Sequence, residues 1–337
     1  MTDPSLPNPL QRLATPLPAP YKSGQMSSPA VPTNTPGLPI HAPLLRKLAV
    51  FAGDIKISHT VFALPFALLS TFLAATARPG GVPHWGQVAL VLACMVTART
   101  LAMAANRLLD AGLDKANPRT ARRAIPAGAL TPAFYVAVSF ACVVGFMAAC
   151  YGFWAVFGNP WPLRLGLPVL LFLCSYPFLK RFTRLCHYYL GMALALAPIC
   201  AWVAVRGTID APPFWMAAAV TCWTAGFDII YACQDYQSDV ATGVFSVPAK
   251  LGIAPALWVA RLTHVAAAGF LIALGSSARP PLGTLYFAGV GLACTLLVVE
   301  HLLVRADDLS KVGLAFFTIN GVISVLVGAL GVADVFV

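Results

Sequence analysis

Nine long apolar segments dominate the sequence, each close to or above the ~20 residues that a helix needs to cross a bilayer. They cover approximately residues 56–77, 84–113, 131–153, 164–180, 186–205, 212–235, 255–275, 281–304 and 312–334. The breaks between them contain turn-forming stretches such as ARPGGVPH and FGNPWP. Continuous apolar runs indicate helices, whereas a membrane barrel would show roughly ten-residue segments of alternating hydrophobicity. The sequence therefore predicts an all-α membrane protein with nine transmembrane helices.

The amino-acid composition excludes a soluble domain. Of the 337 residues, 59% are hydrophobic and 10% are charged, whereas globular domains average about 45–50% apolar and ~25% charged residues. The net charge of +10 could indicate a nucleic-acid partner, but the basic residues lie in short loops, as membrane topology requires. The nine cysteines lack C-x-x-C spacing, which indicates small apolar residues rather than metal ligands or disulfides. We expect a lipid bilayer around the chain and no nucleic acid; nothing in the sequence indicates an oligomeric state.

The distribution of proline divides the chain into two regions. Residues 1–44 are rich in proline and lack a periodic apolar pattern, which is typical of a disordered tail. Residues 45–337 contain all nine apolar segments and form the predicted membrane domain.

Basic residues are distributed unequally between two sets of loops. The loops after the second, fourth, sixth and eighth segments contain Lys115, Arg119, Arg122, Arg123, Lys180, Arg181, Arg184, Lys250, Arg305 and Lys311. The opposite loops contain one arginine each, at positions 78, 164, 206 and 279. Because cytoplasmic loops carry the excess of lysine and arginine, we expect a multi-pass protein of the inner cell membrane whose richly basic loops face the cytoplasm.

Acidic residues are scarce and clustered. The chain has twelve, and five of the six between residues 55 and 299 fall in NRLLDAGLD and DIIYACQDYQSD, near the predicted cytoplasmic side. Residues four apart share a helix face, which in the first stretch groups Asn106, Asp110 and Asp114. Residues seven apart differ by only ~20° around a helix, so the second stretch predicts one polar stripe of Asp228, Tyr231, Asp235 and Asp239.

Paired carboxylates on two facing helices form an oxygen cage that suits a divalent cation. Mg²⁺ commonly takes one or two carboxylates, several waters and the phosphate oxygens of a substrate. The expected ligands are Asn106, Asp110, Asp114, Asp235 and Asp239. The alternative is that these residues are merely exposed helix ends, but two such pairs on one side of a chain so poor in acids favour a metal site.

Basic residues close to both motifs predict an anionic ligand. Arg119 follows the first motif, and the stretch YPFLKR at the end of the fourth segment supplies Tyr176, Lys180 and Arg181. Arginine and lysine can clamp a diphosphate and neutralise the charge that develops when it leaves. The alternative is that they only set the membrane topology. The four-residue spacing of Tyr176 and Lys180 favours a role in the site.

Arg99 lies inside the second apolar segment, seven residues before Asn106, and therefore on the helix face of the first motif. An arginine within a membrane needs a partner and commonly marks a substrate path. Two interpretations are open: an ion pair with Asp228, or binding of a substrate carboxylate.

A membrane transporter is the alternative class of protein, because intramembrane aspartates also serve ion pathways. A transporter would require polar groups that continue toward the opposite side of the membrane. Here the acidic clusters are confined to one side. The sequence therefore favours an enzyme.

The motifs resemble those of the UbiA superfamily of intramembrane prenyltransferases. The pattern N-x-x-x-D-x-x-x-D of that superfamily matches Asn106, Asp110 and Asp114, and its D-x-x-x-D pattern matches Asp235 and Asp239. The stretches NPRTARR, YPFLKR and KISHTVFALPFALL also resemble superfamily segments. The resemblance covers the membrane part, from approximately residue 50 to the end.

The resemblance implies nine helices around a central cavity with a polar cytoplasmic mouth, where Mg²⁺ binds a polyprenyl diphosphate. In that arrangement the five motif residues hold the metal. The diphosphate is bound by Arg119, Tyr176, Lys180 and Arg181, and the acceptor faces Arg99, Asp228 and Tyr231. The stretches SHTVFALPFA and YACQD are similar to those of 4-hydroxybenzoate polyprenyltransferases and their menaquinone-pathway relatives.

The implied reaction transfers a polyprenyl group from its diphosphate to a ring carbon of an aromatic acid, above all 4-hydroxybenzoate, in the biosynthesis of ubiquinone-type or menaquinone-type quinones. The expected catalytic residues are Lys180, which assists the leaving diphosphate, Asp228, which activates the phenol, and Arg99, which holds the carboxylate. The alternative acceptor is a naphthoate or a futalosine-derived menaquinone precursor.

Overall fold

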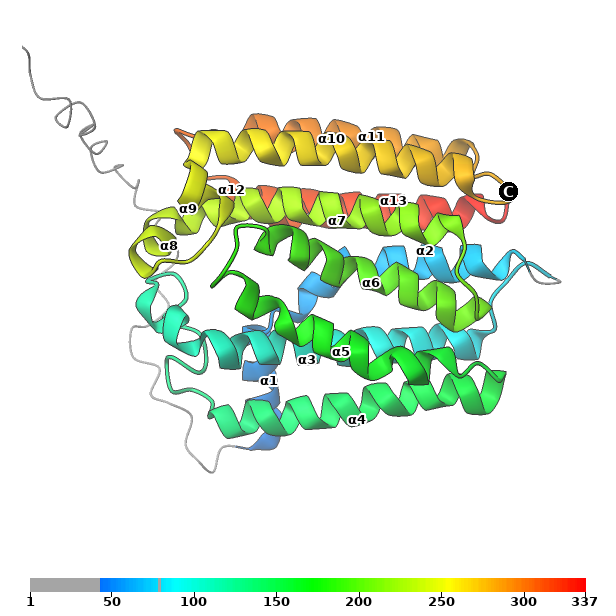
Figure 1. Cartoon of the computed structure of the whole chain (residues 1–337), viewed down its shortest axis with the longest axis horizontal. Helices are drawn as coiled ribbons and strands as arrows, with labels where there is room; N and C mark the ends of the chain where they lie inside the picture. Colours follow the sequence, from blue (N-terminus) through cyan, green and yellow to red (C-terminus); the bar gives the residue numbers. More distant parts are fainter. Residues whose placement is uncertain (1–42, 78–79) are drawn as a thin grey trace, which may run out of the picture. The chain divides into compact units, whose positions relative to one another are not determined.

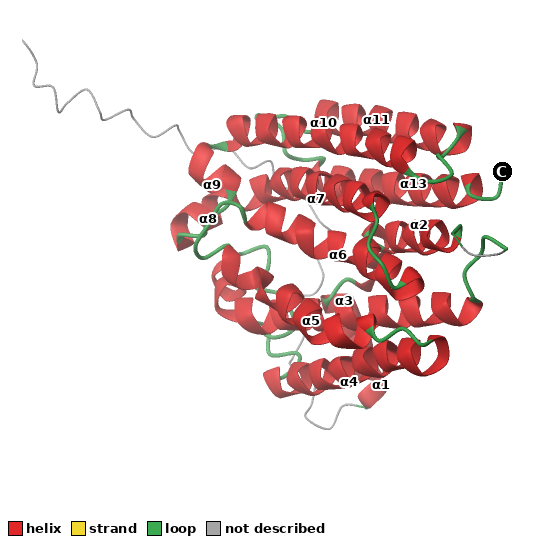
Figure 2. Cartoon of the chain, turned by 45° about the vertical axis from the view of Figure 1, so that its right-hand side comes forward, coloured by secondary structure: helices red, strands yellow, loops and turns green. Residues whose placement is uncertain are grey.

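The computed structural model describes residues 43–77 and 80–337 of the chain. Within them every regular element is a helix (Figure 2). Eight spans are long and apolar enough to cross a membrane: α3 (Trp85–Ala116), α4 (Pro132–Phe157), α5 (Trp161–Leu179), α6 (Cys186–Arg206), Ala211–Thr242, α10 (Ile253–Ser277), α11 (Thr284–Leu303) and Val312–Asp334. With a shorter apolar helix, Thr60–Ala75, they account for the nine predicted segments. The predicted all-α membrane fold is confirmed.

Two of these spans are composite. The span Ala211–Thr242 consists of α7 (Ala211–Ala232), the 3₁₀ helix η3 (Cys233–Asp235) and α8 (Tyr236–Thr242). A short helix, α9 (Val247–Leu251), follows it. The last span consists of α12 (Val312–Leu314), the π-helix η4 (Ala315–Ile319) and α13 (Asn320–Asp334). π-helical turns inside α-helices are frequently found at functional sites.

The first apolar segment is not the single uninterrupted span that the sequence predicted. It is divided into a 3₁₀ helix, η2 (Ile57–Phe62), and α2 (Leu64–Ala75). The twelve residues of α2 rise only ~18 Å, less than the hydrocarbon thickness of a bilayer. The chain enters η2 through Lys56, a non-glycine residue with a positive φ of 49°. Such a conformation is rare for a residue with a side chain, and it turns the chain sharply before the segment begins.

Before this turn lies α1 (Leu44–Asp54), a helix that was not predicted from the sequence. It is too short to span a membrane, and only part of its surface is buried: Phe51 is buried, whereas Leu45 is exposed. The Phe51 ring meets Tyr135 of α4 edge-on, with 5.0 Å between ring centroids. The predicted disordered tail lies outside the described residues except for positions 43 and 44, and it stays a prediction.

The spans contact one another largely in chain order. α3, α4 and α5 pack together, and α6 links α5 to α7 (Figure 1). The order continues through α10 and α11 to α13, which returns to α2. A buried cluster containing Trp202, Trp223 and Tyr286 fills the space among α2, α6, α7, α10, α11 and α13. The helices α3 to α7 instead surround a cavity of about 410 Å³.

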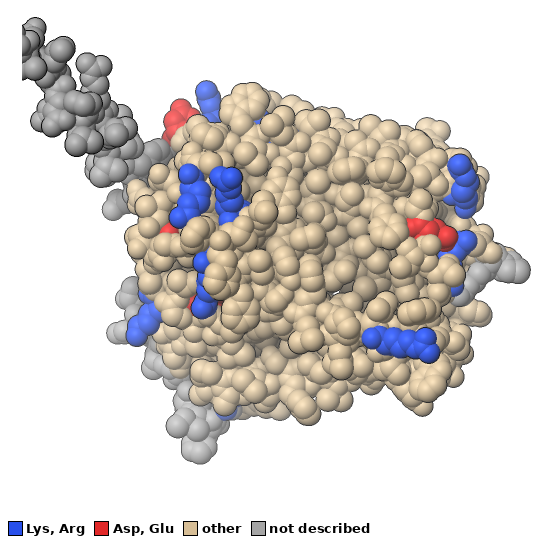
Figure 3. Space-filling view, in the orientation of Figure 1, with Lys and Arg blue, Asp and Glu red and all other residues tan. Residues whose placement is uncertain are grey.

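The loops gather at two opposite ends of the helices. One end, on the left of Figure 1, carries the loops after α3, α5 and α11 and the short helices α8 and α9. We name it the motif end, because Asp110 and Asp235 lie there, and name the other the far end. On the face seen in Figure 3, charged side chains gather toward these two ends and leave an uncharged band between them. Such a band is the surface that lipid tails require.

Candidate active site

The first acidic motif occupies the last turns of α3 at the motif end. Asn106 Nδ2 donates a hydrogen bond of 3.0 Å to Asp110 Oδ2, and the Lys180 ammonium, which directly follows α5, forms an ion pair with the same carboxylate. Asp114 Oδ1 accepts from Arg123 Nη1 at 2.6 Å. Asp110 and Asp114 are both buried, so their charges depend on these basic partners.

The second motif lies where α7 changes into η3 and α8. Asp235 accepts hydrogen bonds from Arg119 and from Asn117 Nδ2, the latter at 2.9 Å. Tyr231, one turn earlier, accepts from Arg119 Nη1 at 3.0 Å, so it faces the same side as Asp235. Asp239 Oδ2 accepts from the Ser246 hydroxyl at 2.8 Å. The predicted stripe is therefore interrupted by the 3₁₀ turn, which winds more tightly than an α-helix, and Asp239 is turned toward the start of α9.

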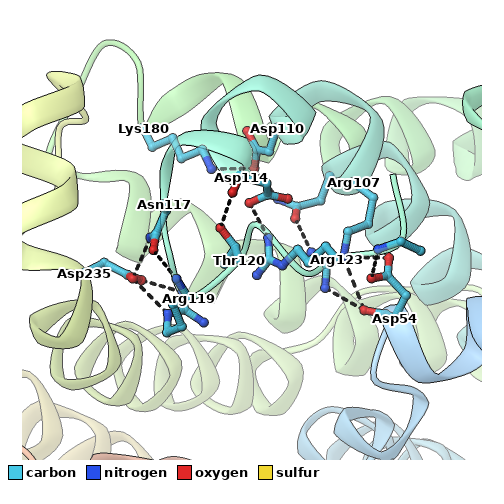
Figure 4. Close-up of polar contacts among 12 residues, drawn as sticks. Asp54, Arg107, Asp110, Asp114, Asn117, Arg119, Thr120, Arg123, Lys180 and Asp235 are labelled. Carbon is cyan, nitrogen blue, oxygen red and sulfur yellow. Dashed lines mark hydrogen bonds and ion pairs between the residues drawn. The ribbon is translucent and has the colours of Figure 1, made fainter. Parts of the chain in front are cut away.

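The two motifs face one group of basic side chains (Figure 4). Arg119, in the loop after the first motif, forms its ion pair with Asp235 of the second motif. Asn117 of the same loop also donates to Asp235, and Lys180 forms its ion pair with Asp110. The loop after the first motif thus joins the two acidic rows, which lie beside a shared space rather than in separate surroundings.

The oxygen atoms of the first motif fit a metal ion. Asp110 Oδ1 and Asp114 Oδ2 are buried and have no hydrogen-bond partner among the described residues. A buried carboxylate oxygen without a partner is costly, and a divalent cation would satisfy it. In the described part of the chain no three Asp, Glu, His or Cys side chains are grouped as a metal site by themselves. Mg²⁺ commonly takes one or two carboxylates from a protein and completes its shell with water and phosphate oxygens.

Beside the motifs the cavity extends from the motif end toward the far end. Near the motifs its lining contains polar side chains, among them Lys56, Arg99, Asn106, Arg107, Arg123, Tyr176, Asp228 and Tyr231. The remaining lining is apolar except for Thr224 and includes Val91, Phe153, Leu165, Val203 and Ile209. On α3 it runs from position 91 to position 107, which corresponds to ~24 Å of helix. One polar end and a long apolar body suit an amphiphilic ligand with a charged head.

Arg99 lies in this lining and forms no ion pair with a carboxylate among the described residues. Its Nη2 donates a hydrogen bond of 3.1 Å to the backbone oxygen of Lys56. Asp228, which lines the same cavity, is bound instead by His187 Nδ1 at 2.7 Å. Of the two interpretations of Arg99, the ion pair with Asp228 is therefore not formed in the described part of the chain.

Arg181 shares the Asp110 carboxylate with Lys180: its Nη2 is 3.9 Å from Asp110 Oδ1. It is exposed, and the same Nη2 donates to the backbone oxygen of Leu109 at 2.7 Å. Tyr176, in contrast, lines the cavity. Arg181 thus lies beside the first motif, whereas Tyr176 belongs to the cavity lining.

Some residues of the site were not predicted as members of it. Arg107 forms a buried ion pair with Asp54, at 3.2 Å between Nε and Oδ2, and Asp54 also accepts from Tyr135 and from the backbone N–H of Ala124. This network fixes the end of α1 to α3 and to the loop before α4. The only signal in the sequence was an arginine directly after Asn106, and helix periodicity places it on a different face.

Lys56 and His187 were also missed. The Lys56 side chain lines the cavity near Arg99. Burial lowers the pKa of Lys56, and so do nearby arginines, with Arg119 the first among them. In the sequence His187 is an isolated histidine, but in the structure it forms a hydrogen bond with Asp228. Neither residue belongs to a spacing pattern, so only the packing of helices could reveal it.

Comparison with known proteins identifies the family. Residues 67–322 match the family model of the UbiA prenyltransferase family. The chain belongs to that family. Because the UbiA family is a family of enzymes, the transporter alternative has no remaining support.

Curated relatives within the UbiA family share about a quarter to a third of their residues with this chain. The mitochondrial 4-hydroxybenzoate polyprenyltransferase of Arabidopsis thaliana is 32% identical over 228 residues, which cover 66% of this chain but only 53% of that protein. The 4-hydroxybenzoate octaprenyltransferase of Marinobacter nauticus is 27% identical over 285 residues, covering 84% and 93%. The enzyme of the same name from Shewanella loihica is 30% identical over 238 residues, covering 69% and 80%.

Solved structures of UbiA homologues have the same fold. The apo form of a homologue from Aeropyrum pernix K1 is 28% identical and aligns with a TM-score of 0.69 over 82% of this chain and 97% of that one. A homologue from Archaeoglobus fulgidus, bound to GPP and Mg²⁺, is 15% identical and aligns with a TM-score of 0.61 over 86% and 100%. The second likeness concerns the fold alone.

Proposed function

We propose that this protein is a Mg²⁺-dependent intramembrane prenyltransferase that transfers a polyprenyl group to a ring carbon of 4-hydroxybenzoate in quinone biosynthesis. One observation carries the proposal: Arg99, which pairs with no carboxylate among residues 43–77 and 80–337, and Asp228 line the polar end of an apolar cavity that the two acidic motifs border. The names of the relatives, 4-hydroxybenzoate polyprenyl- and octaprenyltransferases, support the same acceptor.

The diphosphate of the donor belongs at the acidic motifs. The oxygens of Asn106, Asp110, Asp114, Asp235 and Asp239 would hold Mg²⁺. When bound, Mg²⁺ neutralises the charge of the diphosphate and makes it a better leaving group. The relatives crystallised with GPP or DMAPP and Mg²⁺ support this assignment by analogy.

The basic residues that form ion pairs with the acidic motifs can also bind the diphosphate of the donor. Lys180 and Arg119 are engaged with Asp110 and Asp235. A metal ion on those carboxylates would free the two cations for the diphosphate oxygens, to which arginine binds bidentately. Tyr176 in the cavity lining and Arg181 beside Asp110 complete the expected diphosphate-binding set.

The acceptor belongs between Arg99 and Asp228. The Arg99 guanidinium can bind the carboxylate of an aromatic acid, and the Lys56 ammonium in the same lining adds a second positive charge. Asp228 can accept the phenolic proton, which makes the ring carbon beside the hydroxyl a stronger nucleophile. Tyr231 lines the same end of the cavity, next to Arg119.

The apolar part of the cavity suits the prenyl chain. Departure of the diphosphate leaves an allylic carbocation, which water would destroy. Because the apolar lining excludes water, the ring carbon of the acceptor is the nucleophile that reaches the carbocation. The ring proton then passes to the released diphosphate, which acts as the base, and the ring regains its aromaticity. The excess of basic residues at the motif end supports a cytoplasmic position for it, in the inner membrane of the cell.

A membrane-fraction assay tests the proposal. Membranes containing the protein are supplied with geranyl diphosphate, Mg²⁺ and one acceptor at a time: 4-hydroxybenzoate, 1,4-dihydroxy-2-naphthoate or phenol. Mass spectrometry then detects the prenylated product. We expect product from 4-hydroxybenzoate, far less from phenol, and none when EDTA replaces Mg²⁺. Product from the naphthoate alone would assign the alternative acceptor, and product from phenol at the same rate would remove the role of the carboxylate.

A further inference from the structure

His187 connects three parts of the protein at the motif end. It lies in the first turn of α6 and is buried, with 3% of its surface exposed. Its Nδ1 is 2.7 Å from Asp228 Oδ2 on α7, and its Nε2 is 3.2 Å from the backbone nitrogen of Val247, the first residue of α9. The ring does not line the cavity, whereas Asp228 does.

The two hydrogen bonds fix the tautomer of the ring. A backbone N–H can only donate, so Nε2 must accept the bond from Val247 with its lone pair. The proton of the neutral ring is then on Nδ1, which donates it to Asp228 Oδ2. This bond occupies one carboxylate oxygen, while Oδ1 of Asp228 has no hydrogen-bond partner among the described residues. The oxygen that remains is the one available to a ligand in the cavity.

We propose that His187 is the positioning residue of Asp228 in prenyl transfer. Its Nδ1–H holds Oδ2, so that Oδ1 presents its lone pair to the hydroxyl of the acceptor. A general base acts well only when its orientation is fixed by a further group. The inference rests on the proposed function, because it assigns Asp228 to the acceptor.

The contacts of His187 also connect Asp228, the residue assigned to the acceptor, to Asp239 of the second motif. Ser246, the residue before Val247, donates its hydroxyl proton to Asp239 and caps α9 by accepting from the backbone N–H of Ala249 at 3.2 Å. The segment that fixes the tautomer of His187 is therefore the segment that holds Asp239. A purely structural role for His187 would depend on its bond to Val247, whereas a positioning role depends on its bond to Asp228.

Two substitutions separate these roles, because each retains one of the two bonds. The amide nitrogen of His187→Asn can replace Nδ1 and keep the donor to Asp228. The longer side chain of His187→Gln reaches the place of Nε2, where its amide oxygen can accept from Val247. We expect His187→Asn to keep kcat within about threefold, and His187→Gln to lose about 100-fold in kcat. The KM for geranyl diphosphate should not change in either.

The measurement uses the full-length protein in detergent with geranyl diphosphate, Mg²⁺ and 4-hydroxybenzoate. A parallel assay without acceptor follows the release of diphosphate by the wild type, a step that does not involve Asp228. If the wild type releases diphosphate but prenylates none of the acceptors, the proposed function fails. If the wild type prenylates and the Gln variant equals or exceeds the Asn variant, the role of His187 is overturned while the proposed function stands.

A spectroscopic measurement covers the case in which neither variant folds. Nitrogen-15 NMR of histidine-labelled wild-type protein reports which ring nitrogen carries the proton, and the resonance that moves in Asp228→Asn identifies His187. We expect a neutral ring protonated on Nδ1. A ring protonated on Nε2 alone could not donate to Asp228 and would overturn the inference.

Discussion

The guanidinium of Arg119 donates to both carboxylate oxygens of Asp235, with Nε at 2.9 Å and Nη2 at 2.6 Å, although 116 residues separate them in the chain. This bidentate interaction holds the loop after the first acidic motif against the second motif. Asn117 in the same loop adds a hydrogen bond to Asp235. The two motifs are therefore parts of one site, and the residue that joins them is suited to bind a diphosphate.

Replacing Arg119 by lysine retains the positive charge but removes the planar guanidinium, whose bidentate hydrogen bonding lysine cannot reproduce. We expect the KM for geranyl diphosphate to rise about tenfold, which corresponds to ~1.4 kcal/mol of binding free energy. Arg122→Lys is the matched control, because Arg122 is exposed in the same loop. Steady-state kinetics compare the two variants. An equal effect of both substitutions would contradict a specific role for Arg119.

The carboxylates of Asp110 and Asp235 are expected to be essential because they bring the metal to the donor. Asp110→Asn and Asp235→Asn should each lower kcat by about 100-fold or more. Asp210→Asn is the control, since Asp210 lies outside both motifs and forms an ion pair with Arg206 at 2.7 Å. Turnover is measured across a Mg²⁺ titration, with circular dichroism as the check of folding. A folded double variant of Asp110 and Asp235 that still turns over would reject the metal site.

Arg99 and Arg107 lie about two turns apart on α3, yet they should respond differently to substitution by leucine. Arg99 pairs with no carboxylate in the part of the chain that the structure describes, so Arg99→Leu should raise the KM for 4-hydroxybenzoate at least about tenfold without a loss of stability. Arg107 is buried against Asp54, so Arg107→Leu should lower the free energy of unfolding by about 3–5 kcal/mol. Kinetics and thermal unfolding in detergent measure the two effects. An unchanged KM in Arg99→Leu would exclude its role at the acceptor.

The remote end of the cavity should limit the length of the prenyl donor. Ala204 lies in the lining near the end of α6, so Ala204→Phe fills space that only a long chain would occupy. We expect turnover of long donors to fall about tenfold or more, while geranyl diphosphate is used as before. Met192→Phe, on the exposed face of the same helix, is the control. Equal loss with short and long donors would show that the chain does not reach Ala204.

Gly191 allows the closest approach of α6 to α7. A Cβ atom at this position would lie 2.3 Å from the backbone oxygen of Thr221, and the backbone cannot move away as a side chain can. Gly191→Ala should therefore lower the free energy of unfolding by about 3 kcal/mol. Gly269→Ala, where a Cβ meets nothing within 4 Å, should raise it by about 0.5–1 kcal/mol. Thermal unfolding in detergent compares the two, and equal stabilities would contradict the close contact.

Periodicity along single helices was sufficient for much of the site. The four-residue spacing that grouped Asn106, Asp110 and Asp114 holds in the structure, because α3 is one continuous helix through these positions. The stripe from Asp228 to Asp239 was predicted less well, since the 3₁₀ turn at Cys233–Asp235 changes the angle between successive side chains. Residue spacing predicts which side chains share a helix face only where the helix is a regular α-helix.

The sequence by itself determined the class of fold, the number of apolar spans and the residue types that two acidic motifs bring to one end. These properties follow from composition and short spacings, which act within one helix at a time. Only the tertiary structure decided that Asp228 pairs with His187, that Arg107 pairs with Asp54, and that Arg99 donates to the backbone oxygen of Lys56. Partners from different helices are distant in the chain, and their choice depends on how whole helices pack.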